Sequence, residues 1–91
     1  MMLTQRQETI LNLIVNHYTK TASPIGSGTI SNSQKLGISP ATIRKEVAVL
    51  EETGYITRSH SSAGSIPLHK AYKLYVKSMT ASRARLVPIN T

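Results

Sequence analysis

Residues 37–54 (GISPATIRKEVAVLEETG) constrain the fold of this chain most, because they hold the start and the end of one helix. The hydroxyl of Ser39 can accept a hydrogen bond from a free amide of the first turn, and Pro40 at the first helical position sacrifices no hydrogen bond. Gly54 can take the left-handed conformation that closes a helix, and Gly37 can do the same for a preceding helix. The sequence therefore predicts two helices joined by a tight turn.

The predicted helix has two different faces. Its apolar residues recur at helical spacing and must face a core: Ile43, Val47 and Leu50. Its outward residues are small or cationic: Ala41, Lys45 and Ala48, with Thr42 and Arg44 at the edges. Small side chains allow a close approach, and cations reach phosphates or base edges. The pattern is typical of a DNA-recognition helix, but a core helix with a solvated face has the same pattern, so the rest of the chain must decide.

Charge is distributed unevenly along the 91 residues, whose formal net charge is +7. Residues 1–52 hold five basic and four acidic residues, whereas residues 53–91 hold six basic residues and no acidic residue. This asymmetry favours a polyanionic partner, because basic side chains that neutralise phosphates release bound counterions. The length of the chain suits one small domain.

The composition indicates an aliphatic core, because 40% of the residues are hydrophobic while Phe, Trp and Cys are absent. Without cysteine no disulfide can form, so nothing indicates an oxidising compartment. No stretch approaches the roughly 20 apolar residues that a membrane span requires. We therefore expect a cytoplasmic protein that has no membrane contact.

Two further helices are predicted before the central one. Thr4 and Gln7 form a capping-box pattern and predict a first helix over about residues 5–20. Ser27 is expected to cap a short second helix over about residues 28–35. The second helix and the central helix then form a helix-turn-helix.

A hairpin is predicted after the central helix. Residues 55–58 are rich in β-branched and aromatic residues and predict a strand, and residues 59–65 have the composition of a turn that returns through Ile66. A helix-turn-helix followed by a hairpin is a winged helix. The expected fold class is therefore mainly α with a small β-hairpin, a winged helix-turn-helix.

Pro67 is expected to open a last helix. The expected buried stripe of this helix is Tyr72, Tyr75, Val76 and Met79, and its cationic stripe is Lys70, Lys73 and Lys77. We expect residues 1–79 to form a winged-helix DNA-binding domain and residues 80–91 to form a flexible tail or the start of a linker.

Over roughly residues 3–79, the chain resembles the N-terminal DNA-binding region of the heat-inducible transcription repressor family, HrcA. The matching pieces are LTQRQ at 3–7, PIGS at 24–27, SPATIR at 39–44, HSSAG at 60–64, and IP at 66–67 with Tyr72 and the YV pair at 75–76. The resemblance implies a stress-response repressor that binds an inverted-repeat operator upstream of chaperone genes as a homodimer. It also implies control by a GroEL-type chaperonin through a longer C-terminal part of the family.

The chain departs from the family pattern at several positions. Gly28 stands where a lysine is common, and Ser65 stands where the family pattern Ala-Gly-Arg has its arginine. Leu68 and His69 replace a usual Thr and Asp at the start of the last helix. A phosphate contact at residue 28 and a groove contact at residue 65 therefore cannot be carried over.

The expected DNA-binding residues lie on the two helices of the helix-turn-helix and on the hairpin. They are Ser27, Thr29, Ser39, Pro40, Ala41, Thr42, Arg44, Lys45, Ala48, Arg58, His60, Ser61, Ser62 and Gly64. Arg44 is expected to reach a guanine edge or a phosphate, and Lys45 is expected to reach a phosphate. The residues of the second helix and the hairpin are expected to contact the DNA backbone.

Other functions have weaker support in the sequence. The histidines His17, His60 and His69 do not share the spacing of a helical metal pair, and no cysteine or aspartate accompanies them. The four glutamates form no recognisable acid and base pair, so we expect no enzyme, no catalytic residue, no metal and no cofactor. The alternatives left open are a winged-helix protein-interaction module and a non-specific nucleic-acid binder.

Overall fold

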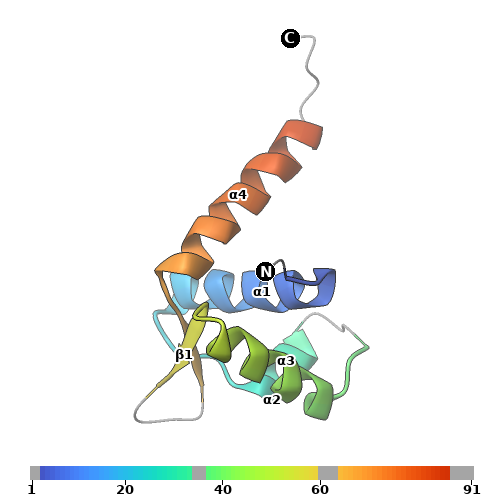
Figure 1. Cartoon of the computed structure of the whole chain (residues 1–91), viewed down its shortest axis with the longest axis vertical. Helices are drawn as coiled ribbons and strands as arrows, with labels where there is room; N and C mark the ends of the chain where they lie inside the picture. The colour runs from blue at the N-terminus through green and yellow to red at the C-terminus, as the bar shows by residue number, and fades with distance from the viewer. Residues whose placement is uncertain (1–2, 34–36, 60–63, 87–91) are drawn as a thin grey trace.

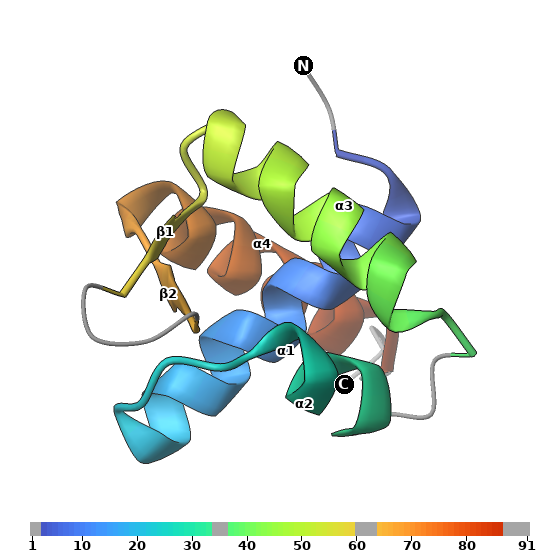
Figure 2. The same ribbon diagram turned by 90° about the horizontal axis from the view of Figure 1, so that it is seen from below.

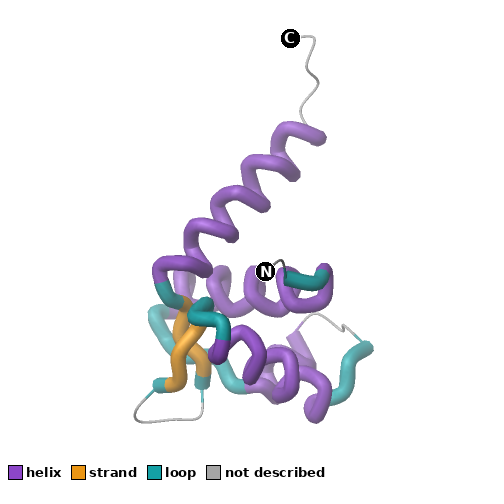
Figure 3. Tube along the Cα trace, in the orientation of Figure 1, coloured by secondary structure: helices purple, strands orange, loops and turns teal. Residues whose placement is uncertain are grey.

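The computed structural model describes residues 3–33, 37–59 and 64–86, which form helices and one antiparallel hairpin. The elements are α1 (Gln5–Thr21), α2 (Ser27–Ser33), α3 (Pro40–Glu52), β1 (Ile56–Arg58), β2 (Ser65–Pro67) and α4 (His69–Leu86) (Figure 1). Figure 3 colours the helices, the strands and the described loops by type. The predicted fold class, mainly α with a hairpin in the order of a winged helix, is confirmed.

Helix α1 starts at the predicted capping box. The Thr4 hydroxyl accepts the N–H of Gln7 at 3.1 Å, and the Gln7 side-chain oxygen accepts the N–H of Thr4 at 3.0 Å. This reciprocal pair satisfies two amides that the helix leaves without backbone partners. The buried face of α1 is Ile10, Leu11, Ile14 and Val15.

The core forms around that face of α1 and is aliphatic, as the composition predicts. The other buried hydrophobic residues are Ile25, Ile30, Ile43, Leu50, Ile56 and Ala71. They come from the loop before α2, from α2, α3, β1 and α4, so each of these segments contributes at least one side chain to a shared interior. Burial of this kind is the main stabilising term in a small domain.

Helix α3 has the ends that its sequence predicts. The Ser39 hydroxyl accepts the N–H of Thr42 at 3.2 Å, and Pro40 is the first helical residue. Gly37 and Gly54 have φ values of +71° and +86°, in the left-handed region that glycine enters without a steric penalty. Helix α2 packs against α3 in the manner of a helix-turn-helix (Figure 2).

The hairpin is joined to the loop before α2. Within it, Ile56 pairs with Pro67 and Arg58 pairs with Ser65. On its other edge Ser65 forms a bridge with Ile25, because the Ser65 N–H donates to the Ile25 carbonyl at 2.8 Å and the Ile25 N–H donates to the Ser65 carbonyl at 3.2 Å. The backbone of Ser65 therefore links the hairpin to the helix-turn-helix.

Three predicted boundaries were wrong. Ser27 is the first residue of α2 rather than its cap, because the Ile30 N–H bonds to the Gly26 carbonyl. Ser65 belongs to β2 rather than to the turn, because it pairs on both sides. Pro67 closes β2 rather than opening a helix, and α4 begins at His69.

The buried stripe predicted for α4 was also partly wrong. Val76 is 60% exposed and Met79 is 54% exposed, whereas Ala71 is fully buried and Leu74 packs against the core. The physical reason is the direction of α4, which leaves the body of the domain after its first turns (Figure 1). The helix continues past Met79 to Leu86, and the division into residues 1–79 and 80–91 stays a prediction.

Replacing Gly64 with alanine should destabilise the fold, because the new Cβ would lie 2.6 Å from the Cβ of Pro24. Overpacking of this kind lowers the free energy of unfolding by about 1–3 kcal/mol. Urea denaturation followed by circular dichroism measures the change. Gly28→Ala is the matched control, because a Cβ added at Gly28 would have no heavy atom within 4 Å. Alanine in place of glycine in a helix should raise the free energy of unfolding by about 0.5–1 kcal/mol. A Gly64→Ala variant as stable as the unaltered protein would refute this close packing.

Candidate nucleic-acid interface

The outward face of α3 is exposed along its first three turns. The exposed residues on or beside this face are Pro40, Ala41, Arg44, Lys45 and Ala48. Ala41, Lys45 and Ala48 follow one another at helical spacing, opposite the buried Ile43 and Leu50. The structure therefore brings the predicted contact residues of this helix together on one accessible surface.

Ser39 and Thr42 hold the start of that surface. Besides accepting the Thr42 N–H, the Ser39 hydroxyl donates to the Thr42 hydroxyl at 3.0 Å. Ser39 is exposed and Thr42 is half-buried at the helix start. The structure assigns both residues to the cap, and their predicted contact with DNA stays a prediction.

Glu46 on the flank of α3 is held by the first turn of α1. Its carboxylate accepts a hydrogen bond from the Gln7 side-chain amide at 3.0 Å and lies 3.4 Å from a guanidinium nitrogen of Arg6. The Glu46 side chain is only 15% exposed. Arg6 and Gln7 were missing from the sequence-based set of site residues, because partners 39 and 40 residues away leave no local pattern.

Glu51, near the end of α3, pairs with the hairpin. The Arg58 Nε atom of β1 lies 3.7 Å from a Glu51 carboxylate oxygen, and the Arg58 side chain is 63% exposed. Pairs of this exposure contribute little to stability, roughly 0–1 kcal/mol. The pair holds the Arg58 guanidinium beside the Glu51 carboxylate, where the guanidinium remains accessible to a phosphate.

Because the Arg6–Glu46 and Arg58–Glu51 pairs offset two acidic charges of α3, the start of α3 is its electropositive end. Two of its three carboxylates have an arginine within 4 Å, and the third, Glu52, is exposed near the helix C-terminus. Arg44, Lys45 and the positive end of the helix dipole lie in the N-terminal half. A polyanion is therefore attracted to the first half of α3 and repelled by its last turn.

The remaining predicted contacts lie on α2 and the hairpin. On α2, Thr29 is exposed and Ser27 is half-buried, and the Ser31 hydroxyl donates to the Ile38 carbonyl at 3.2 Å across the turn. Gly64 is buried against Pro24, and its carbonyl accepts the Ser59 N–H at 3.0 Å. The predicted contacts His60, Ser61 and Ser62 lie outside the described residues. The structure thus gives Gly64 a packing role.

Ser65 also has a role different from that of the family's arginine. Its residue is only 6% exposed, because β2 packs it between β1 and the bridge to Ile25. A groove contact by the side chain at position 65 has no support in this geometry.

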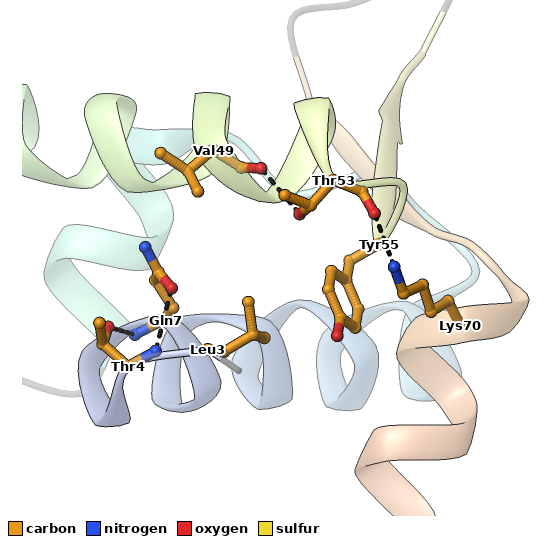
Figure 4. A pocket seen from close by; sticks show the side chains of 7 residues that line it. All are labelled: Leu3, Thr4, Gln7, Val49, Thr53, Tyr55 and Lys70. Carbon is orange, nitrogen blue, oxygen red and sulfur yellow. Dashed lines mark hydrogen bonds between the residues drawn. The ribbon is translucent and has the colours of Figure 1, made fainter. Parts of the chain in front are cut away.

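A hollow of about 340 Å³ lies between the start of α1, the second half of α3 and the start of α4 (Figure 4). Its lining residues are Leu3, Thr4, Gln7, Val49, Thr53, Tyr55 and Lys70. The Lys70 ammonium donates to the Thr53 carbonyl at 2.9 Å and lies 4.5 Å from the centre of the Tyr55 ring. These contacts fasten α4 to the end of α3.

Across residues 3–33, 37–59 and 64–86, no group of three or more histidine, cysteine, aspartate or glutamate side chains is arranged to hold a metal ion. Among the helices in this described part, none combines the length and the apolar character needed to cross a bilayer.

Together, the order of elements, the exposed cationic start of α3 and the hairpin beside it define a winged helix-turn-helix. This is an architecture in which a recognition helix enters the major groove of DNA. The chain belongs to the LexA DNA binding domain family, whose pattern matches residues 1–64.

Similar proteins include heat-inducible transcription repressors named HrcA. The chain is 53% identical over 76 residues to the repressor of Pelotomaculum thermopropionicum and 53% identical over 79 residues to that of Clostridioides difficile. These matches cover 84% and 87% of this chain but 22% and 23% of the relatives. The resemblance to their family is confirmed, and the chain spans about a quarter of their length.

A solved structure has the same fold. It is the crystal structure of a hypothetical protein at 2.2 Å resolution, with a TM-score of 0.83 and 35% sequence identity. The similarity covers 87% of this chain and 25% of that chain.

Ser39→Ala should lower the free energy of unfolding by about 1 kcal/mol, because the Thr42 N–H loses its acceptor. Ser39→Asp should retain the stability, since aspartate also caps helices and its charge suits the N-terminal end. Urea denaturation of both variants and the unaltered protein measures the difference. An aspartate variant as unstable as the alanine variant would rule out the cap as the cause.

Proposed function

We propose that this chain is the DNA-binding part of a heat-inducible transcription repressor and that it inserts α3 into the major groove of an inverted-repeat operator. The observation that carries the proposal is the surface at the start of α3, where Arg44 and Lys45 are exposed beside Ala41 and Ala48. The pairing of Glu46 and Glu51 with arginines supports it, because it reduces repulsion of phosphates. Membership of the LexA DNA binding domain family and the names of the HrcA relatives support the same function.

In this proposal the residues of α3 have different roles. Arg44 donates two hydrogen bonds to a guanine edge or contacts a phosphate, and Lys45 neutralises a phosphate. The methyl groups of Ala41 and Ala48 allow the helix to approach the base edges and contact thymine methyl groups. Ser39, Pro40 and Thr42, at the start of α3, lie nearest the DNA backbone.

Contacts with the DNA backbone come from the flanking elements. They are Ser27 and Thr29 on α2, Arg58 on β1, and His60, Ser61 and Ser62 between the two strands, whereas the buried Gly64 keeps its packing role. One winged helix covers about half of an inverted repeat, so two copies read one operator in the cytoplasm. A single copy binds weakly and with strong salt dependence. Regulation by a chaperonin is assigned to the longer C-terminal part of the family.

The first test selects duplexes from a random library and then measures fluorescence anisotropy on the selected inverted repeat and on its scrambled sequence. We expect the selected duplex to bind at least about tenfold more tightly, since base contacts add to the shared phosphate term. Equal affinity for the two duplexes would support non-specific binding instead. Absence of binding to either duplex at low salt would favour a protein-interaction module.

Single substitutions on α3 separate base readout from phosphate contact. Arg44→Ala should cost about 1–3 kcal/mol on the selected duplex and less on the scrambled one. Lys45→Ala should weaken binding of both duplexes similarly. It should also reduce the slope of log affinity against log salt concentration by about one unit. Lys77→Ala is the charge-matched control, because Lys77 is an exposed lysine of α4, outside the helix-turn-helix and the hairpin. If Lys77→Ala weakened binding as much as Lys45→Ala, α3 would not be the contact surface.

A further inference from the structure

Helix α4 has two uncovered stripes that the proposed DNA contact does not use. One is cationic and consists of the exposed residues Lys70, Lys73 and Lys77. The other is apolar and consists of Val76 and Met79, which are both more than half exposed, with the half-buried Tyr72 one turn before Val76. The spacing of three and four residues places the two stripes side by side along α4. We call them together the α4 surface.

The lysines of the α4 surface lack acidic partners. The ion pairs among the described side chains are those of Arg6 with Glu46 and of Arg58 with Glu51, and residues 53–91 contain no acidic residue. Lys70 is turned toward the Thr53 carbonyl and the Tyr55 ring. Lys73 and Lys77 have no counterpart of this kind in the described part of the chain, and their charge is therefore available to a partner.

A hollow of about 290 Å³ runs beside these lysines. Its lining residues are Tyr55, Lys70, Lys73, Leu74 and Lys77. The tyrosine ring and the leucine supply apolar lining, and the three ammonium groups supply charge. Tyr55 and Lys70 also line the hollow of Figure 4, so the two depressions adjoin one another. Apolar lining combined with several cations fits a ligand that is itself both apolar and anionic.

The chemistry of the α4 surface selects one kind of occupant. A second copy of α4 would bring lysine stripes of the same sign together, which is repulsive. Duplex DNA would satisfy the lysines but would leave Val76 and Met79 in water. We propose that the α4 surface binds an acidic amphipathic helix of a partner protein, whose apolar face covers Val76 and Met79 and whose carboxylates face Lys73 and Lys77 beside them.

This occupant leaves the DNA surface free. Beyond its first turns, helix α4 extends away from α2, α3 and the hairpin, as Figure 1 shows. The partner helix and a DNA duplex can therefore bind the same copy of the domain at once.

The test uses a fluorescent synthetic helix with leucine on one face and glutamate on the other, together with a peptide of the same composition in scrambled order. Fluorescence anisotropy should show that the amphipathic peptide binds at least about tenfold more tightly than the scrambled peptide. Lys73→Glu should weaken binding of the amphipathic peptide about tenfold and leave the preference for the selected duplex intact. Val76→Ser should weaken it several-fold, and circular dichroism should show that both variants are folded, because both residues are exposed.

Lys45→Glu is the matched control, because it makes the same charge change on α3. It should abolish binding of the duplex and leave peptide binding within about twofold. Equal binding of the two peptides, or equal weakening of the amphipathic peptide by Lys45→Glu and Lys73→Glu, would show attraction by net charge alone and overturn the proposal. Loss of duplex binding in Lys73→Glu would identify DNA as the occupant of α4. Duplex binding and peptide binding are measured separately, so failure of either proposal is distinguishable from failure of the other.

Discussion

The buried face of α1 is the constraint on which the rest of the domain depends. Ile10, Leu11, Ile14 and Val15 are fully buried, and α2, α3, α4 and β2 all contact this helix. Helices α2 and α3, of 7 and 13 residues, and the three-residue strand β2 are too short to be stable alone in water, so they obtain their stability from burying side chains against α1. The position of α3 is therefore set by aliphatic packing on its inner face, which leaves its outer face free to carry small and cationic residues.

Local signals in the sequence predicted most of the fold and much of the candidate site. The capping box of α1, the Ser39 cap, and the glycines at positive φ act within a few residues of their partners, and each was predicted correctly. The exposure of Val76 and Met79 was not predictable, because a helical spacing of apolar residues does not say whether another element covers them. Ser65 pairs with Arg58 in the hairpin and also with Ile25, 40 residues earlier in the chain, and the turn composition of its segment revealed neither pairing.

Charge in this domain is arranged by long-range pairing rather than by sequence order. Residues 1–52 are nearly neutral overall, yet the start of α3 is electropositive because Glu46 and Glu51 are each paired with an arginine from another element. Gln7 takes part both in a local helix cap and in a long-range contact. Its side-chain oxygen completes the cap of α1, while its amide nitrogen donates to Glu46. The first turn of α1 therefore influences both the stability of its own helix and the electrostatic surface of α3.

The bridge between Ile25 and Ser65 has a consequence for how the domain meets a duplex. Because two backbone hydrogen bonds join the loop before α2 to the hairpin, the distance between the helix-turn-helix and the hairpin is held by the backbone. In the proposed complex, in which α3 and the hairpin both contact the DNA, these two contact points at a fixed distance cannot adjust to grooves of different width, so the duplex itself changes shape. The energy of that change depends on base sequence, and recognition then extends to base pairs that no side chain reaches.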